Sequence, residues 1–97
     1  MRHEIVVAPE AVEDFSRLPA TVRSKVRDAI ETHLRHEPTK TSRSRMKRLR
    51  GMSRPQYRLR VDDVRVFYDV SDSVVEILAI VLKSGATGWL EQRGEEE

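Results

Sequence analysis

Residues 56–82 read QYRLRVDDVRVFYDVSDSVVEILAIVL, and this stretch decides the fold of the chain. Three runs rich in β-branched and aromatic residues, at 56–61, 64–70 and 74–82, are separated by short turns of aspartate and serine. Turns of two residues, such as Asp62-Asp63, join neighbouring antiparallel strands. The sequence therefore predicts a three-stranded antiparallel meander. Its third run is apolar on both faces, which is typical of a central or covered strand.

The segment before the meander has the pattern of a strand followed by two helices. Residues 3–7 (HEIVV) are rich in β-formers, and apolar residues then recur at helical spacing over 9–18 and 20–37. Pro19 and Pro38 end these two helical runs. We expect an α+β domain in which the N-terminal strand and the meander form one sheet with a helical hairpin packed on one face. This single domain should cover residues 1–90, and residues 91–97 should form a flexible acidic tail.

Composition excludes several classes of site. The chain has 97 residues and no cysteine, so one compact core is expected and thiolate metal sites, disulfides and cysteine nucleophiles are excluded. No stretch approaches the roughly 18 apolar residues of a membrane span, so we expect a cytoplasmic protein without a membrane partner. His33 lies beside the apolar stripe of the second helix, where packing is its default role, and the other histidines lack metal-ligand spacing with it. We therefore expect no metal and no cofactor.

The basic residues are concentrated in one part of the chain. Half of its 18 lysines and arginines lie between residues 38 and 61, where there is no Asp or Glu. These nine are Lys40, Arg43, Arg45, Lys47, Arg48, Arg50, Arg54, Arg58 and Arg60. Segregated positive charge attracts polyanions and releases their counterions, whereas the alternative is a merely solvated surface. Residues 39–53 have little periodicity and are predicted to form a long basic connection or arm.

Alternation along the first two meander strands predicts an arginine face. A two-residue turn at Asp62-Asp63 pairs Arg60 with Arg65 and leaves Arg58 on the same face. Directly opposed like charges destabilise a sheet, so a phosphate held between guanidinium groups is their natural explanation. The alternative is that each arginine pairs with a nearby aspartate. We also expect Arg65→Ala to leave the fold almost intact, because Arg65 points away from the helices.

Three motifs follow in order: KRLRGM at 47–52, YRLR at 57–60 and VRVFYDV at 64–70. With the order of strand, helical hairpin, basic connection and meander, the chain from about residue 3 to 83 resembles the RelE/ParE superfamily of toxins from type II toxin–antitoxin modules. The resemblance implies a cognate antitoxin as partner. For the RelE-like branch it implies a metal-independent mRNA interferase, which enters the ribosome and cuts mRNA through the ribose 2′-hydroxyl.

The resemblance also assigns roles to residues. Arg58, Arg60 and Arg65 match the basic residues around the scissile phosphate, and Lys83 is the remaining catalytic candidate. The expected RNA-binding residues are Lys47, Arg48, Arg50 and Arg54. The RelE branch carries a further arginine and a tyrosine after the last strand, and here that region reads KSGATGWL. A ParE-like inhibitor of DNA gyrase, or a catalytically weak RNA-binding relative, is therefore the alternative.

Overall fold

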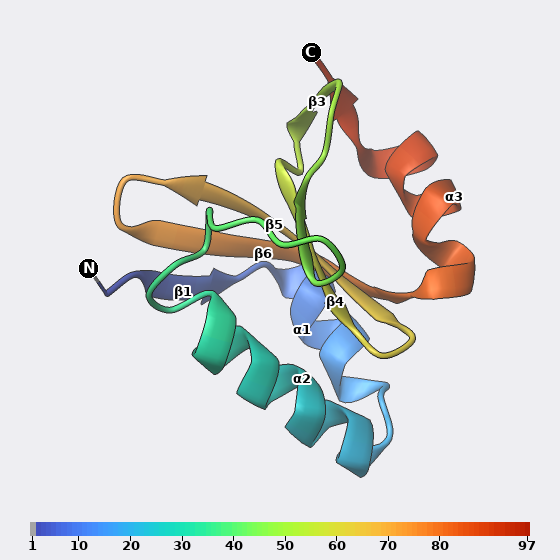
Figure 1. The fold of residues 1–97 in the computed structure, drawn as a ribbon. Coiled ribbons are helices and arrows are strands. Elements are labelled where there is room, and N and C mark those ends of the chain that lie inside the picture. Colours follow the sequence, from blue (N-terminus) through green and yellow to red (C-terminus); the bar gives the residue numbers. More distant parts are fainter. Residues whose placement is uncertain (1) are drawn as a thin grey trace.

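A computed structural model describes residues 2–97 and contains a five-stranded sheet in the order β1-β6-β5-β4-β2 (Figure 1). Its strands are β1 (Glu4–Val7), β2 (Met46–Arg48), β4 (Tyr57–Val61), β5 (Val64–Ser71) and β6 (Val74–Leu82). β1 runs parallel to β6, and the other neighbours are antiparallel. The predicted α+β class and the predicted meander are confirmed.

A tight turn joins each pair of neighbouring strands in the meander, and the pairing of β5 with β6 shifts register between Phe67 and Tyr68. Asp62 and Asp72 adopt positive φ values of 51° and 50°, a conformation that aspartate tolerates better than most residues. Across the first turn, Arg60 pairs with Arg65 and Leu59 with Val66, as the sequence predicts. The side-chain alternation of β4 and β5 therefore follows the expected register.

Two helices cover one face of the sheet. They are α1 (Pro9–Ser16) and α2 (Ala20–His33). Pro19 lies between them as the N-cap of α2, but α2 ends at His33, before the predicted end at Pro38. The core between helices and sheet is built from fully or almost fully buried side chains: Ala11, Leu18, Val26, Ile30, Leu34, Met46, Leu59, Val64, Val66, Tyr68, Val75, Ile77 and Ile80. β6 lies between β1 and β5 in the sheet, so the prediction of a central strand is confirmed.

The structure differs from the prediction at both ends of the meander. Residues 39–53 are not wholly irregular, because β2 adds a fifth strand with Met46 facing the core, and β3 (Met52–Arg54) pairs with β7 (Glu95–Glu96). A third helix, α3 (Lys83–Arg93), follows β6 and covers the opposite face of the sheet from α1 and α2 (Figure 1). Trp89 of α3 stacks on Phe67 of β5 with ring centroids 5.1 Å apart. The stack stabilises α3, although Gly85 and Gly88 lower the helix propensity of its sequence.

None of the helices within residues 2–97 is long and apolar enough to cross a lipid bilayer.

Candidate nucleic-acid interface

Four cationic side chains share the sheet face opposite α1 and α2. Arg60 pairs with Arg65 across β4 and β5, and Lys47 of β2 pairs with Arg58 of β4. Direct partners in an antiparallel ladder project from the same face, and alternation places Arg58 beside Arg60. We call Lys47, Arg58, Arg60 and Arg65 the basic face. The predicted convergence of arginines from two neighbouring strands is confirmed.

The basic face carries no carboxylate of its own. Among residues 2–97, none of its members forms an ion pair with Asp or Glu. The Asp62 carboxylate instead accepts a hydrogen bond of 3.3 Å from Lys25, and Asp69 lies 3.6 Å from Arg54. The alternative in which nearby aspartates neutralise these arginines is therefore wrong. Lys47 and Arg60 are exposed on this face, whereas Arg65 is almost fully buried. α3 packs on the same face through the stack of Trp89 on Phe67, the direct partner of Arg58.

Arg58 is the most electrostatically frustrated member of the basic face. Its side chain is half-buried, and desolvation, followed by the charges of Arg65 and Arg60, lowers its pKa. Its Nε is buried without a hydrogen-bond acceptor in the part of the chain that the structure describes, and its Nη2 reaches Ser44 O only at 3.4 Å. A buried donor without a partner is destabilising, and a phosphate oxygen would relieve both this penalty and the repulsion.

Arg65 has a structural as well as an electrostatic role. Only 6% of it is exposed, and its Nη1 donates to the carbonyl oxygens of Asp62 and Val64 at 2.8 and 3.1 Å. These bonds tie the guanidinium to the turn that sets the register of the hairpin. These contacts lead us to expect that Arg65→Ala destabilises the fold, in place of the small effect expected from the sequence, because truncation would leave the Asp62 and Val64 carbonyl groups without their donor. Alternation gave the direction of the side chain but not its burial.

The remaining catalytic candidate, Lys83, begins α3. Its backbone N–H donates to Asp63 O at 2.7 Å, which places it at the end of the sheet where Arg60 and Arg65 lie. Neither Tyr57 nor Tyr68 lies at this end of the basic face, because both face the core. Tyr68 is fully buried among the core residues, donates its hydroxyl to Pro38 O at 2.7 Å and stacks on Tyr57. Burial, and then the neighbouring Tyr57, raises the pKa of Tyr68, so its hydroxyl stays protonated.

The other predicted RNA-binding residues lie in different surroundings. Arg54 faces three carboxylates, of Asp69 at 3.6 Å, Glu76 at 3.5 Å and Glu95 at 4.0 Å. The guanidinium of Arg48 donates to three backbone carbonyls and lies 3.5 Å from Glu97. Arg50 is exposed and, within residues 2–97, takes part in no ion pair. Of the four residues predicted to bind RNA, the structure thus brings Lys47 to the basic face.

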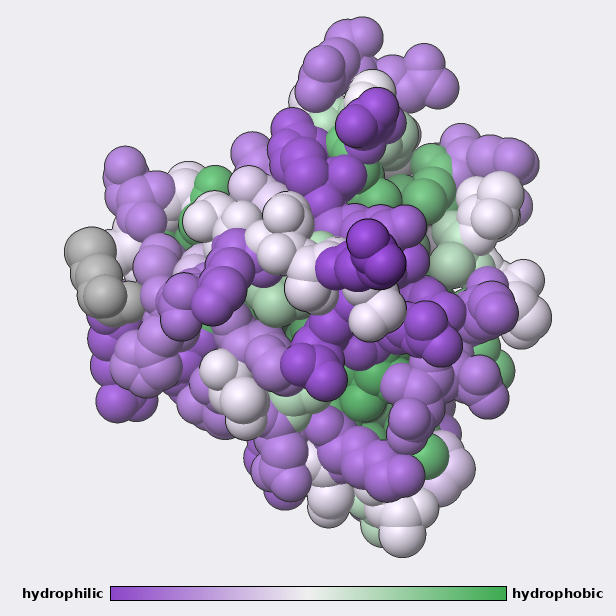
Figure 2. All heavy atoms as spheres, viewed as in Figure 1, coloured by the Kyte–Doolittle hydropathy of each residue, from purple (hydrophilic) through white to green (hydrophobic). Residues whose placement is uncertain are grey.

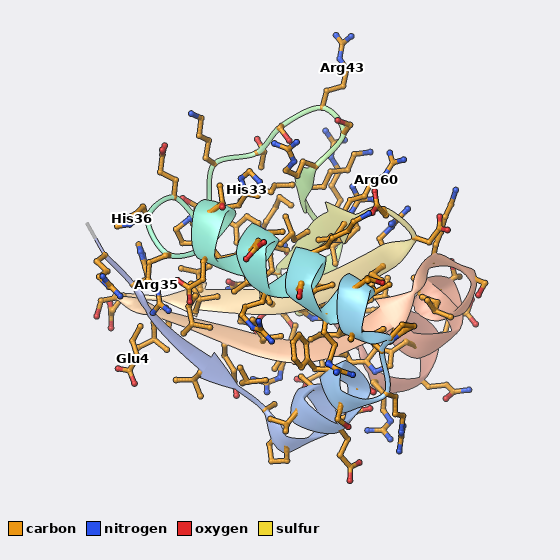
Figure 3. All side chains as sticks on the ribbon, turned by 90° about the horizontal axis from the view of Figure 1, so that it is seen from below. Glu4, His33, Arg35, His36, Arg43 and Arg60 are labelled. Atoms are coloured by element: carbon orange, nitrogen blue, oxygen red, sulfur yellow. The ribbon has the colours of Figure 1, made fainter. Side chains whose placement is uncertain are left out.

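Surface and side-chain views agree with this division. Figure 2 shows strongly hydrophilic side chains gathered over β4 and the segment that precedes it. In Figure 3, Arg60 lies against the sheet, whereas Arg43 projects from the tip of the connection away from the body. Within the described range 2–97, no group of three His, Asp or Glu side chains lies close enough to hold a metal ion. The arrangement is suited to binding a phosphodiester and stabilising negative charge on it.

Sequence reasoning missed the carboxylates around Arg54. Glu76, Asp69 and Glu95 come from three strands distant in sequence, so no local spacing could reveal them. Asp69 accepts a hydrogen bond from the backbone N–H of Gln56 at 2.7 Å, and burial raises the pKa of its carboxyl. The sole available signal was the position of Asp69 in a strand that is otherwise mostly apolar.

Solved structures show where this fold occurs. A mutant of the Escherichia coli toxin RelE in the free state is similar, with a TM-score of 0.73 and 21% identity over 94% of each chain. RelBE2, a toxin–antitoxin complex from Mycobacterium tuberculosis, gives a TM-score of 0.69 and 22% identity over 84% of this chain and 99% of that one. The archaeal RelE–RelB complex from Pyrococcus horikoshii gives 0.65 and 26% over 86% and 97%.

Sequence comparison identifies the family. No curated protein sequence matches the chain. Residues 5–84 match the family described as the ParE toxin of the type II toxin–antitoxin system parDE. The match extends from β1 to the start of α3 and so includes the helical hairpin, the basic connection and the meander. The chain therefore belongs to the ParE toxin family, within the RelE/ParE superfamily of type II toxin–antitoxin toxins.

Proposed function

We propose that this toxin inhibits translation by cleaving mRNA on the ribosome, and that Arg58, Arg60 and Arg65 hold the scissile phosphate. One observation carries the proposal: these three arginines converge on one face without a carboxylate partner among the residues that the structure describes. Guanidinium groups match phosphate oxygens in a bidentate way. Stability alone does not favour Arg60 opposite Arg65, whereas binding a polyanion does.

The proposed reaction is an internal transesterification. The ribose 2′-oxygen attacks phosphorus, the bond from phosphorus to the 5′-oxygen breaks, and a cyclic phosphate and a free 5′-hydroxyl form. The arginines offset the extra negative charge of the pentacoordinate transition state and align the attacking and leaving oxygens. Arginine stays protonated, so it cannot accept the 2′ proton. We assign to Lys83, the amine at the same end of the sheet, donation of a proton from its ammonium group to the leaving 5′-oxygen, while a water molecule takes the 2′ proton.

The test compares two exposed arginines that differ in position. Arg60 belongs to the basic face, whereas Arg43 lies at the tip of the connection (Figure 3). We expect Arg60→Ala to reduce cleavage of mRNA on programmed ribosomes by about 100-fold, the usual effect of removing one transition-state donor. Arg43→Ala should stay within about threefold of the unmodified protein. Equal activity of the two variants would reject the assignment of the phosphate site.

A second function, inhibition of DNA gyrase, is favoured by two observations. The matching family is described as the ParE toxin, and both tyrosines of the meander face the core rather than the basic face. A gyrase inhibitor needs no proton-transfer group. Induction in cells separates the two functions: a rapid block of translation with cleaved mRNA supports the nuclease, and gyrase-trapped DNA breaks without mRNA cleavage support the inhibitor.

We also propose an antitoxin as the cellular partner and the cytoplasm as the location. The similar structures from M. tuberculosis and P. horikoshii contain a toxin together with its antitoxin. A pull-down from cells that express this chain with its neighbouring genes tests the first proposal. The expected product is a stable complex with a small protein, and the chain should then lose its toxicity.

A further inference from the structure

The acidic end of the chain lies on the basic connection. β7 (Glu95–Glu96) pairs with β3, with Glu96 opposite Met52 and Glu95 opposite Arg54, and Figure 1 shows this end beside β3. The backbone N–H of Glu97 donates to Gly51 O at 3.0 Å, and Ser53 Oγ donates to Glu95 O at 3.1 Å. Residues 95–97 are thus bound along β3 as an added strand.

Charge pairs accompany the backbone contacts. Glu97 lies 3.5 Å from Arg48, and Glu95 lies 4.0 Å from Arg54. Both arginines belong to the nine basic residues of the 38–61 segment. Each forms an ion pair with a carboxylate of the acidic end, in a position where it could bind a phosphate instead. The Arg48 and Arg54 side chains are 39% and 45% exposed, so solvent screens these pairs and each is individually weak. A polyanion can therefore displace them.

α3 and Gly94 bring the acidic residues to this position. α3 is fixed by the stack of Trp89 on Phe67 and by the contact of Arg93 with Glu10 at 3.3 Å. Gly94 ends the helix against Met52, and a β-carbon at Gly94 would overlap the Met52 side chain and the Leu90 carbonyl. Residues 95–97 are consequently held close to β3 at a high effective concentration.

We propose that β3, Arg48 and Arg54 form a docking site for an extended acidic segment, that residues 95–97 are its occupant, and that this segment competes with nucleic acid. The proposal rests on the proposed function, because it requires the basic connection to bind the same polyanion as the basic face. It adds that the chain carries an internal competitor. The exposed members of the basic face, Lys47 and Arg60, are accessible to nucleic acid, whereas Arg48 loses its carboxylate only when the acidic segment leaves. Arg54 then loses Glu95 but keeps Asp69 and Glu76 as partners.

The test neutralises the acidic segment without changing its length. The variant Glu95→Gln/Glu96→Gln/Glu97→Gln is compared with Glu4→Gln/Asp28→Asn/Glu91→Gln, which removes three exposed carboxylates that form no ion pair within residues 2–97. Binding of a labelled single-stranded RNA is followed by fluorescence anisotropy at several salt concentrations. We expect the first variant to bind about three- to tenfold more tightly than the unmodified protein, because two carboxylate pairs are lost. The control should bind less than twofold more tightly.

A second variant breaks the docking without changing any charge. Gly94→Ala places a β-carbon where Met52 and Leu90 leave no room, so residues 95–97 should leave β3. We expect tighter RNA binding, as in the first variant, and faster hydrogen exchange of the Glu97 amide, which donates to Gly51 O in the docked state. This exchange measurement reports docking without any nucleic acid.

The outcomes separate this proposal from the proposed function. Equal tightening by the test and control variants would show a general charge effect and overturn the competition. The competition would also be overturned if RNA binding were unchanged in both the neutralised variant and Gly94→Ala. An unprotected Glu97 amide in the unmodified protein would overturn it as well. Either result would leave the basic face as the proposed RNA site. If no variant binds RNA at low salt and Arg60→Ala has no effect, the proposed function fails and the competition fails with it.

Discussion

The two faces of the β4–β5 hairpin differ in how their polar side chains are satisfied. On the inner face, Tyr57 stacks on Tyr68 with ring centroids 5.4 Å apart, and the buried Tyr68 hydroxyl is hydrogen-bonded to Pro38 O. On the outer face, Arg60 opposes Arg65, and the half-buried Arg58 keeps an Nε without a partner among residues 2–97. The inner face satisfies the Tyr68 hydroxyl, whereas the outer face leaves Arg58 Nε unsatisfied and places like charges side by side.

This difference shows which side of the hairpin carries unfavourable charge. Burial of apolar surface and satisfied hydrogen bonds on the inner face favour folding. Like charges opposed across strands and a desolvated guanidinium on the outer face oppose it. An unfavourable arrangement that persists on one face of a stable hairpin is typical of a functional site.

Arg65→Ala should have the largest effect on both stability and activity, because Arg65 belongs to the basic face and is also hydrogen-bonded to the turn between β4 and β5. Loss of its bonds to the Asp62 and Val64 carbonyls should lower the free energy of unfolding by about 1–3 kcal/mol. Cleavage of mRNA should also fall by at least about 100-fold. Urea unfolding and cleavage on programmed ribosomes measure the two effects.

Two variants sharpen this test. Arg60→Ala removes a neighbouring arginine that is exposed and, within residues 2–97, donates no side-chain hydrogen bond, so it should lose activity with little change in unfolding. Arg65→Lys keeps the charge but not the planar fork, so it should recover only part of the activity. If Arg65→Ala unfolds at the same urea concentration as the unmodified protein, the structural role assigned to Arg65 is wrong.

The sequence was sufficient to predict the meander and the register of its first hairpin, but not the shift of register between Phe67 and Tyr68 in the pairing of β5 with β6. Alternation of arginine with apolar residues, and the two aspartates between Val61 and Val64, gave the pairing of Arg60 with Arg65 that the structure has. Local signals were strong there because a shift by one residue would expose Leu59 and bury Arg58. The direction of the arginines followed from the same alternation.

Residues outside the meander could not be placed in the same way. β2 and β3 have three residues each, so their own sequences carry little β signal, and each forms by pairing with another strand, β2 with β4 and β3 with the distant β7. α3 contains Gly85 and Gly88 and depends on the stack of Trp89 on Phe67. The docked position of residues 95–97 depends on α3 in turn. Their flexibility in solution stays a prediction.

Tyr68→Phe tests the inner face, with a smaller expected effect. At pH 7 the variant loses the bond to Pro38 O, and its free energy of unfolding should be about 1 kcal/mol lower. Burial raises the pKa of Tyr68 in the folded protein, so the unfolded chain ionises first. The stability that Tyr68 contributes is therefore fully present below pH 10 and falls by about 1.4 kcal/mol per pH unit above it.

The pH dependence gives this prediction a clear result. The difference between Tyr68→Phe and the unmodified protein should disappear near pH 11, because only the unmodified protein loses this contribution. Urea unfolding at pH 7, 9, 10 and 11 measures it. Tyr57→Phe is the matched control, since Tyr57 is only partly buried and donates no hydrogen bond within the described range 2–97. A constant difference from pH 7 to pH 11 would contradict the burial of an un-ionised Tyr68 hydroxyl.

Arg50→Ala should have the smallest effect, because Arg50 lies in neither face of the hairpin. It is exposed and, among residues 2–97, forms no ion pair, so it can contribute one flexible phosphate contact. We expect RNA binding to weaken about two- to fivefold and the slope of log K against log salt to fall by about 0.7. Arg2→Ala, an exposed arginine beside β1 at the far edge of the sheet, should leave both quantities unchanged. If Arg50→Ala weakened binding as much as Arg60→Ala, the RNA site would extend over the connection and would not be centred on the outer face of the hairpin.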